Sequence, residues 1–572
     1  MKTLALIVLA SCAASPRPFP FREPLATDTD MKDVSVDCRD SPTKDDAHHR
    51  SCTPAPYVSP FIWDQLDNVL FARISRGLSI HTTGEAANAN SLDEVADSSW
   101  FVNKPRGEGS HDDAPGACTP ADMLAEANDV KPGEWVIDHG KDNGSTLGFR
   151  VNIPGKGKYM FKADDEGLPD RASAASVIGA AIYDEVGFNT SCEQIVLFKR
   201  EQLTLAPGLK VTDNEGISHP FDEEALDKAL KSTTHHAGGM IRMQGSKWLP
   251  GETLGPFRYT GTRADDPNDV IDHASRRELR GSRLLAAWLD HWDAREQNSM
   301  DVWMSADSKT KDASPGHVVH YILDTSDTMG GAVGVDEMSR RLGHSYNFDL
   351  SDVGRSLFTF GIMEFPWDRA EKLPGREKFS YYSTREFDPG GWKPLYPNPA
   401  FLAMTERDAA WMARKLARFS REDILRIVKL GRWQDMGDVA FLTNTLEVRL
   451  HRIFVRYFSK LSPLGEVRLD GSKICATDYA RLREIGPAST FHYRVVERHG
   501  RKAVALEATT GDDGAVCFAP QPMVTGSFAE SDPRRIVVFD VTNGTGAGPL
   551  RIHVYDLGAK GMKIVGLERF ED

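Results

Sequence analysis

The spacing of apolar residues predicts a sheet in the first half of the chain. Between residues 134 and 162, apolar and polar positions alternate over three short segments separated by glycine turns, a pattern typical of a strand meander. The Ala-rich segment 172–186 ends at Gly187 and predicts a helix with a glycine stop. Two further apolar runs, at 195–198 and 239–249, indicate more strands.

The second half of the chain changes from helical spacing back to alternation. From about residue 251 the apolar positions recur at helical spacing, and Thr405 and Ser420 each precede an acidic residue by three, as helix N-caps do. Alternating segments return from about residue 463. This order of elements predicts an α+β fold. We expect an N-terminal extension, a sheet-rich region, a helical region and a β-rich C-terminal module, over residues 61–133, 134–250, 251–462 and 463–572.

The N-terminus has the pattern of an export signal. The apolar run from Leu4 to Ala10 is too short to cross a bilayer, but it suits the apolar part of a secretory signal over residues 1–15. The tetrapeptide LASC, which ends at Cys12, resembles the lipobox of bacterial lipoproteins, and this resemblance implies that Cys12 is acylated. An ordinary signal peptide cleaved nearby is the alternative. The Pro-, Asp- and Ser-rich stretch 16–60 is predicted to be a flexible tether.

These features predict that the protein lies in the bacterial cell envelope. No other apolar run reaches membrane-spanning length, so we expect a soluble body that the lipid on Cys12 holds to the membrane. Ala13 follows the cysteine, and by resemblance to enterobacterial sorting rules it implies the outer membrane, facing the periplasm.

Composition and charge exclude several classes of protein. The 572 residues include 69 Lys and Arg against 83 Asp and Glu, a net charge of −14, so nucleic acid is not an expected partner. Apolar residues make up 40% and charged residues 27%, as in packed globular chains. The chain has seven cysteines, and six remain when Cys12 is set aside as the acylation site. This even number permits disulfides after export. The pairs nearest in sequence are Cys38 with Cys52 and Cys475 with Cys517.

One segment of the helical region carries candidate chemistry. His291, Asp293 and Asn298 form the pattern HxDxxxxN, of which about 0.04 matches are expected by chance in a chain of this composition. The apolar strand predicted at 320–323 then delivers Asp324 into a turn. A capped turn between a helix and a strand is the structural alternative, since Asp and Asn favour such places.

A lysine and three glycines upstream complete the candidate set. Lys162 ends the third strand of the predicted meander, and Gly140, Gly144 and Gly148 lie in the loop before it. Glycines permit close approach of the backbone to phosphates, and a lysine neutralises them. A solvated surface lysine is the alternative interpretation of Lys162.

This order of motifs resembles the protein-kinase-like superfamily, and more closely its atypical HipA-type and spore-coat CotH-type branches. The segment 291–300 is similar to the catalytic loop, 322–327 to the metal-binding strand and turn, and 159–162 to the strand that carries the nucleotide lysine. The resemblance implies a two-lobed fold, with an N-lobe at 134–250 and a helical C-lobe at 251–462. The stretches DSSWF at 97–101 and GPFRY at 255–259, together with the segment 291–300, are also similar to those of a group of uncharacterised bacterial exported lipoproteins. This similarity extends from about residue 61 to the C-terminus.

The roles of these residues follow from the needs of phosphoryl transfer, which is mostly positioning and charge neutralisation. Lys162 is expected to bind the phosphates of ATP, beside the three glycines. Asn298 and Asp324 are expected to hold Mg²⁺ or Mn²⁺, and Asp293 to orient the attacking hydroxyl as the catalytic base.

The chain departs from typical protein kinases near the lysine and after the metal ligand. Asp324 is followed by Thr-Ser in place of Phe-Gly, and the glycines are more widely spaced. The helix after Lys162 should supply a glutamate that holds the lysine, but its middle has Ser176, and Glu185 lies by its end. Either Glu185 or a residue outside this helix holds Lys162, or the ion pair is absent.

The sequence therefore predicts an exported lipoprotein whose atypical kinase-like domain transfers a phosphoryl or nucleotidyl group from ATP to an unknown acceptor, with a metal. The alternative is a catalytically inactive kinase-like envelope protein that binds a protein or a glycan, because an exported chain meets little ATP. A metal-dependent hydrolase or phosphatase that uses the same acidic residues is a third interpretation.

Overall fold

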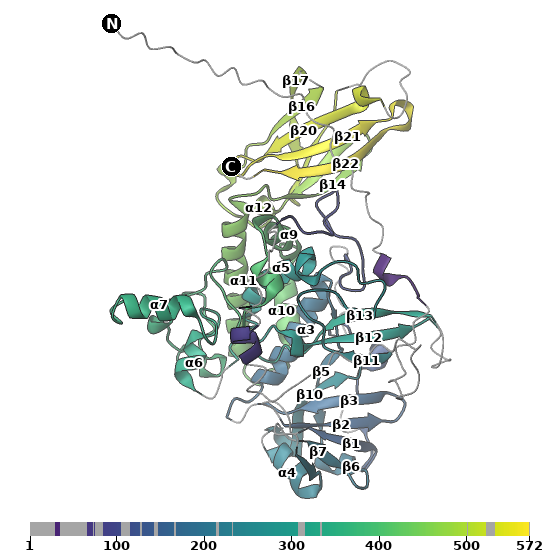
Figure 1. Ribbon diagram of the computed structural model, residues 1–572, viewed down its shortest axis with the longest axis vertical. Coiled ribbons are helices and arrows are strands. Elements are labelled where there is room, and N and C mark those ends of the chain that lie inside the picture. The colour runs from purple at the N-terminus through teal and green to yellow at the C-terminus, as the bar shows by residue number, and fades with distance from the viewer. Residues whose placement is uncertain are drawn as a thin grey trace. The chain divides into compact units, whose positions relative to one another are not determined.

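Helices and strands alternate along the chain in an α+β arrangement, as the sequence predicted (Figure 1). The chain divides into two compact units. One contains Leu25–Ala89 and Val95–Arg456, and the other contains Asn90–Glu94 and Tyr457–Asp572. The structure is a computed structural model, and it describes residues 29–34, 66–71, 74, 84–104, 115–125, 129–141, 147–164, 167–212, 217–231, 233–306, 315–331, 335–499, 502–521 and 532–570.

A seven-stranded sheet opens the larger unit. Its strands lie in the order β5-β10-β3-β2-β1-β6, with β9 paired to β10, and every pair is antiparallel except β1 with β6. The predicted meander is confirmed as β1 to β3, and the predicted strands at 195–198 and 239–249 are β5 and β10. The strand bounds are β1 (Trp135–Lys141), β2 (Gly148–Ile153), β3 (Gly157–Lys162), β5 (Glu193–Phe198), β6 (Leu203–Leu205), β9 (Thr234–His236) and β10 (Met240–Lys247).

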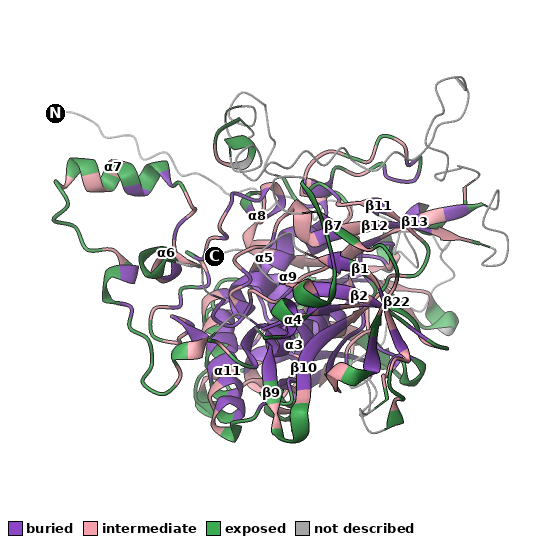
Figure 2. Cartoon of the chain, turned by 90° about the horizontal axis from the view of Figure 1, so that it is seen from below, coloured by how far each residue is buried: buried purple, intermediate pink, exposed green. Residues whose placement is uncertain are grey.

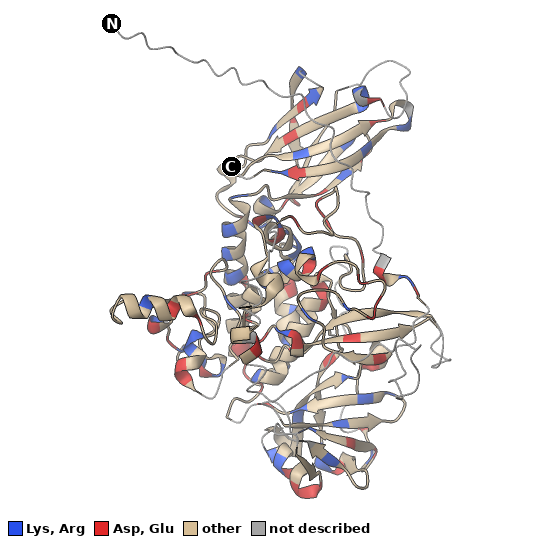
Figure 3. Cartoon of the chain, in the orientation of Figure 1, with Lys and Arg blue, Asp and Glu red and all other residues tan. Residues whose placement is uncertain are grey.

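Two helices and a small hairpin accompany this sheet. The predicted helix is confirmed as α3 (Arg171–Val186), which packs on β5 and β10 and ends at Gly187, whose φ of 126° suits glycine. The amphipathic helix α4 (Glu223–Lys231) has acidic residues in its first turn and basic residues in its last, which favours its dipole (Figure 3). The hairpin consists of β7 (Lys210–Thr212) and β8 (Ser218–Pro220).

A four-stranded sheet and a set of helices complete the larger unit. The sheet has the order β11-β12-β13-β4, and its central hairpin leads into Asp324. Its strands are β4 (Asn189–Thr190), β11 (Glu252–Gly255), β12 (Ser299–Ser305) and β13 (Gly316–Ile322). The side chains of Thr405 and Ser420 cap helices α9 and α10, as the sequence predicted. The helices are α5 (Arg277–Leu289), α6 (Asp336–Arg341), α7 (Leu350–Phe358), α8 (Pro399–Leu402), α9 (Glu406–Leu416), α10 (Arg421–Lys429) and α11 (Met436–Phe458).

Burial differs sharply between the helices (Figure 2). Helix α5 is buried almost throughout, and its arginines Arg277 and Arg280 reach the buried Asp408 of α9 at 3.3 and 3.5 Å. Helix α7 is largely exposed, and the apolar side chains of Phe358 and Phe360 are 85% and 90% exposed. Large exposed apolar groups are characteristic of interaction surfaces.

The smaller unit is rich in strands. Its core consists of apolar residues that alternate along the strands, among them Val495, Phe539 and Ile552. One of its sheets has the order β14-β15-β19-β18 and the other β17-β16-β20-β21-β22. The elements are β14 (Leu464–Asp470), β15 (Lys473–Asp478), α12 (Tyr479–Leu482), β16 (Arg494–His499), β17 (Lys502–Leu506), β18 (Ala508–Thr510), β19 (Ala515–Phe518), β20 (Ile536–Thr542), β21 (Leu550–Asp556) and β22 (Met562–Arg569).

Two disulfides join cysteines of the described residues. Cys475 and Cys517, one of the two candidate pairs nearest in sequence, are joined, and their bond links the paired strands β15 and β19. A second bond joins Cys118 to Cys192 in the larger unit. The candidate pair of Cys38 and Cys52 and the predicted acylation at Cys12 lie outside the described residues.

Among the described residues, no helix is both long enough and apolar enough to cross a bilayer.

Candidate functional site

The segment with the pattern HxDxxxxN forms the loop between α5 and β12. Helix α5 ends where Asp290 adopts a left-handed conformation with a φ of 56°, which Asp tolerates, and the chain turns into the loop. The amide of Leu323 donates to the carbonyl of Asn298 at 2.9 Å. This bond places the end of the loop beside the residue that precedes Asp324.

Asp293 occupies the middle of this loop with both carboxylate oxygens engaged. Its Oδ1 lies 2.8 Å from Arg295 Nε, and its Oδ2 accepts from Asn298 Nδ2 at 3.0 Å. Burial raises the pKa of Asp293 to about 7, although Arg295 acts in the opposite direction. A carboxylate with such a pKa is suited to accept and release a proton near neutral pH.

Asp327 and His291 hold the loop in place. Asp327 accepts from the backbone amide of Asp293 at 2.8 Å, and His291 Nε2 lies 3.4 Å from the other oxygen of Asp327. The second ring nitrogen of His291 meets the hydroxyl of Tyr183 at 2.9 Å. Burial lowers the pKa of His291 to about 4, so the ring is neutral near pH 7. These contacts give His291 and Asp327 a positioning role.

Lys162 and Asp324 form an ion pair within the larger unit. Lys162 Nζ lies 2.9 Å from Asp324 Oδ2, and Ser326 donates to the other oxygen at 2.7 Å. Burial acts to raise the pKa of Asp324, but Lys162 and Ser326 outweigh it and hold that pKa well below the usual range of a carboxyl. The lysine side chain is 15% exposed, so Lys162 is not the solvated surface residue of the alternative interpretation.

Glu193 is the acidic residue near Lys162 that sequence reasoning missed. In the registers of the sheet, Lys162 lies opposite Gln244 on β10, and Glu193 on β5 lies opposite Ser246, two residues further along β10. Residues two apart on a strand share a face, so Glu193 lies on the same face as Lys162. Burial alone would lower the pKa of Lys162, but Asp324 and Glu193 raise it.

The side chain of Glu193 is buried and held by neutral donors. It accepts hydrogen bonds from Ser191, Ser246 and Gln244. Both acidic residues of α3 have other partners, because Asp184 pairs with Lys104 and Glu185 pairs with Arg426 at 2.6 Å. The prediction that a residue outside the helix holds Lys162 therefore fits the contacts, and Glu185 does not hold it. In the sequence, the feature that could have pointed to Glu193 was its position at the start of an apolar-rich strand.

Ser176, where the resemblance to kinases led us to expect a glutamate, lies where α3 packs closely on the turn after Asp324. The hydroxyl of Thr325 donates to the carbonyl of Ser176 at 2.9 Å. A Cβ atom at Gly179, one turn along, would lie 2.6 Å from the side chain of Thr325. The helix thus approaches this turn too closely for a long acidic side chain to lie between them.

Two of the three predicted phosphate-binding glycines have a packing reason in the sheet. A Cβ at Gly140 would lie 2.5 Å from the ring of Phe221, and a Cβ at Gly148 would lie 2.3 Å from the carbonyl of Phe161. Gly144 lies outside the described residues. This close packing accounts for a glycine at positions 140 and 148, so a bound phosphate is not needed to explain either residue.

The candidate metal ligands fit a divalent cation that also binds phosphates. The side-chain nitrogen of Asn298 donates to the backbone carbonyl and the carboxylate of Asp293, which leaves the amide oxygen of Asn298 to face a ligand. Mg²⁺ commonly takes one or two protein oxygens and completes its octahedron with phosphates and water. Within the described part of the chain, no three His, Cys, Asp or Glu side chains are grouped so that they could hold a metal ion by themselves.

Comparisons with protein-family models, with curated proteins and with solved structures find no match to this chain.

Proposed function

We propose that this chain is an atypical kinase-like enzyme that transfers a phosphoryl or nucleotidyl group from ATP with the help of Mg²⁺ or Mn²⁺. The proposal rests on the ion pair between Lys162 Nζ and Asp324 Oδ2, 2.9 Å apart, beside the loop that contains Asp293 and Asn298. Kinase-like enzymes carry the nucleotide lysine on the third strand of their sheet, and Lys162 ends β3. They also place a metal-binding Asp shortly after the catalytic loop, as the β12–β13 hairpin places Asp324.

The arrangement of elements supports a two-lobed kinase-like fold. The N-lobe corresponds to the sheet with α3, and the C-lobe to α5 and the helices that pack on it. Lys162 comes from the first of these parts, and Asp293, Asn298 and Asp324 come from the second. A nucleotide between them would be contacted from both sides.

Each residue has a separate task in the proposed reaction. Asp293 accepts the proton of the attacking hydroxyl, and a pKa of about 7 suits a base near neutral pH. Lys162 neutralises phosphate charge, and Asn298 and Asp324 supply oxygens to the cation. The cation, when bound, neutralises the negative charge that develops on the phosphates. Because Lys162 Nζ lies 2.9 Å from Asp324, the phosphates and the cation would be bound side by side.

Export is part of the proposal. The signal at 1–15 and the lipobox that ends at Cys12 support a lipid-anchored protein of the bacterial envelope, on the periplasmic face of the outer membrane. The acceptor would then be a component of that compartment.

A non-catalytic envelope protein is the second candidate, and one observation favours it. Lys162 is already paired with Asp324, and α3 offers it no carboxylate. In that case the same scaffold would bind a protein or glycan without turnover.

Calorimetric titration of ATP and ADP into the full chain, with and without Mg²⁺ or Mn²⁺, tests the proposal. We expect metal-dependent binding that Lys162→Ala weakens by about tenfold or more, since the lysine contributes its charge to the phosphates. Lys158→Ala is the matched control, because Lys158 lies on the same strand but is 46% exposed and pairs with Asp138. If the folded wild-type chain binds neither nucleotide, the second candidate is favoured.

Glu193→Gln is expected to weaken nucleotide binding about three- to tenfold, because Lys162 then loses one of the two carboxylates that favour its charged form. Glutamine keeps the shape and continues to accept from Ser191 and Ser246. Glu185→Gln, which removes a carboxylate paired with Arg426, is expected to leave the affinity unchanged. Equal affinities of the two variants would show that Glu193 does not position the lysine.

A further inference from the structure

The end of α7 and the residues after it form an exposed apolar segment, residues 356–363, which we call the apolar tip. The three most exposed large apolar side chains among the described residues, Phe358, Phe360 and Ile362, all belong to it. The apolar tip has no Asp, Glu, Lys or Arg. Figures 1 and 2 both show α7 standing out from the rest of the larger unit. The function proposed above assigns no role to this segment.

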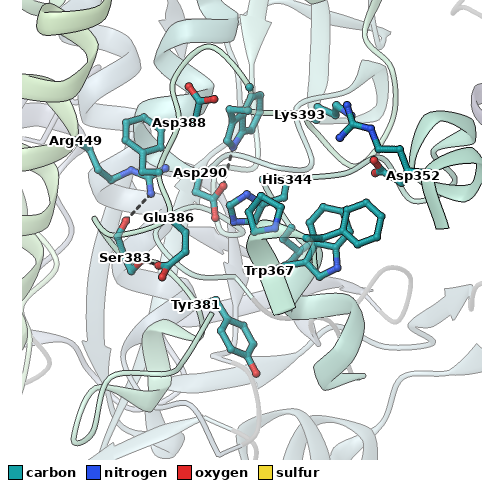
Figure 4. Close-up of a pocket in the computed structure, with 18 residues that line it drawn as sticks. Asp290, His344, Asp352, Trp367, Tyr381, Ser383, Glu386, Asp388, Lys393 and Arg449 are labelled. Atoms are coloured by element: carbon teal, nitrogen blue, oxygen red, sulfur yellow. Dashed lines mark hydrogen bonds between the residues drawn. The ribbon is translucent and has the colours of Figure 1, made fainter. Parts of the chain in front are cut away.

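Helix α7 turns its apolar face outward and its polar face inward. Leu350, Val353 and Leu357 lie on one face at helical spacing, and all three are exposed. Asp352 and Arg355, on the opposite face, both line the cavity drawn in Figure 4, and Asp352 is buried there. A helix on the surface of a water-soluble protein normally has the reverse arrangement. The outward face of α7 is therefore suited to an apolar environment.

The start of α7 is fixed in this orientation. Asp349 caps the helix by accepting from the amide of Ser351 at 2.9 Å, and it also pairs with Lys393 at 2.7 Å. The amide of Asn347 donates to the carbonyl of Leu395 at 2.8 Å. These contacts tie the first turn of α7 to the loop before α8, so they oppose a rotation that would bury the apolar face.

The composition of the apolar tip fits a lipid bilayer better than a protein partner. Protein interfaces draw much of their binding energy from Trp, Tyr and Arg, and they contain many directional hydrogen bonds. The apolar tip has none of these three residue types, and the hydroxyl of Thr359 donates within the helix to the carbonyl of Arg355 at 2.7 Å. Acyl chains accept apolar side chains without directional bonds. Beyond the tip, Glu364 and Arg369 pair with each other, so no excess of positive charge calls for anionic lipids.

The export part of the proposed function brings the larger unit to a membrane. Residues 13–28 lie between Cys12, the predicted acylation site, and Thr29, the first residue of the larger unit that the structure describes. A chain of this length spans at most about 55 Å even when it is fully extended. Stable anchoring of a lipidated protein commonly takes a second contact with the membrane.

We propose that the apolar tip inserts into the surface of a lipid bilayer. Phe358, Phe360 and Ile362 enter the boundary between headgroups and acyl chains, and the polar face of α7 stays on the protein. The proposal rests on the envelope location in the proposed function, but it does not depend on nucleotide transfer.

Flotation of the full chain with phosphatidylcholine vesicles tests the proposal. Every sample carries Cys12→Ser, which prevents acylation, and contains no nucleotide, so the result depends neither on the lipid anchor nor on the proposed reaction. We expect the chain to float with the vesicles, and Phe358→Ser combined with Phe360→Ser to weaken partitioning about tenfold or more, because two exposed rings become small polar groups. Val270→Ser combined with Met436→Ser is the matched control, because both side chains are more than half exposed but lie outside the tip.

Quenching of tryptophan fluorescence by brominated phosphatidylcholine locates the contact. We expect the tryptophan introduced by Phe360→Trp to be quenched and the tryptophan introduced by Met436→Trp not to be quenched. This measurement reports on the tip itself, even if the apolar run at 4–10 also binds the vesicles.

The possible results separate the explanations. Weaker partitioning of the Phe358→Ser, Phe360→Ser variant than of the control supports the proposal, and so does quenching at position 360 where the run at 4–10 keeps every variant on the vesicles. Equal partitioning without that quenching, equal losses in the two double variants, or no binding of the folded chain to vesicles each overturn it. If the wild type sediments as a dimer, the Phe358→Ser, Phe360→Ser variant as a monomer, and neither binds vesicles, a second copy covers the tip instead. Thermal unfolding curves establish that the variants are folded, as expected for exposed positions.

Discussion

Asp324→Asn is expected to abolish metal-dependent nucleotide binding by the full chain, with a loss of about 100-fold or more in affinity. The substitution keeps the shape of the side chain, and its amide oxygen still accepts from Ser326. It removes the negative charge that a divalent cation needs and that now attracts Lys162. Calorimetry with ATP and Mg²⁺ measures the change.

The fold should survive this substitution. The Asp324 side chain is 38% exposed, and ion pairs of partly exposed groups contribute little to stability. Asp336→Asn is the matched control, because Asp336 also pairs with a lysine, Lys372, at 2.6 Å, but on the exposed helix α6. Nucleotide binding that is equal in wild type and Asp324→Asn would refute the kinase-like proposal.

Arg242→Ala is expected to destabilise the larger unit by about 3–5 kcal/mol, the largest stability effect that we expect from one polar substitution. Arg242 is completely buried on β10, and its Nε lies 3.1 Å from Asp170 and 3.9 Å from Asp164. Its terminal nitrogens donate to Ser173 and to two carbonyls after α10. Removing the arginine leaves two buried carboxylates without a counter-charge.

Tryptophan fluorescence during urea unfolding measures this effect in one unit alone, because all 11 tryptophans lie between residues 63 and 433. Arg369→Ala, which breaks an exposed pair with Glu364, is expected to change stability by less than about 0.5 kcal/mol. Arg242→Met combined with Asp164→Asn and Asp170→Asn should recover part of the loss, since the unpaired charges are then absent. A loss below about 1 kcal/mol in Arg242→Ala would show that water reaches these carboxylates.

Local patterns in the sequence determined the elements that carry the candidate site. Alternation over 134–162, the alanines of α3 and the glycine stop at Gly187 predicted β1 to β3 and the helix, because side-chain periodicity and backbone preference act within a few residues. The order of Lys162, the HxDxxxxN loop and Asp324 was also visible along the chain. The pairing of Cys475 with Cys517 remained a candidate until the structure placed them opposite each other on β15 and β19.

The partners of the candidate residues depended on tertiary structure. Lys162 and Asp324 are 162 residues apart, and only the folding of the larger unit brings their charges together. Glu193 reaches the face of Lys162 because β10 lies between β3 and β5, an order that side-chain periodicity does not specify. Burial then raises the pKa of Asp293 to about 7, and burial is a property of the assembled fold rather than of the local chain. The sequence by itself thus determined which residue types lie on which local elements. The tertiary structure decided their neighbours and their charge states, because both depend on contacts between segments far apart in the chain.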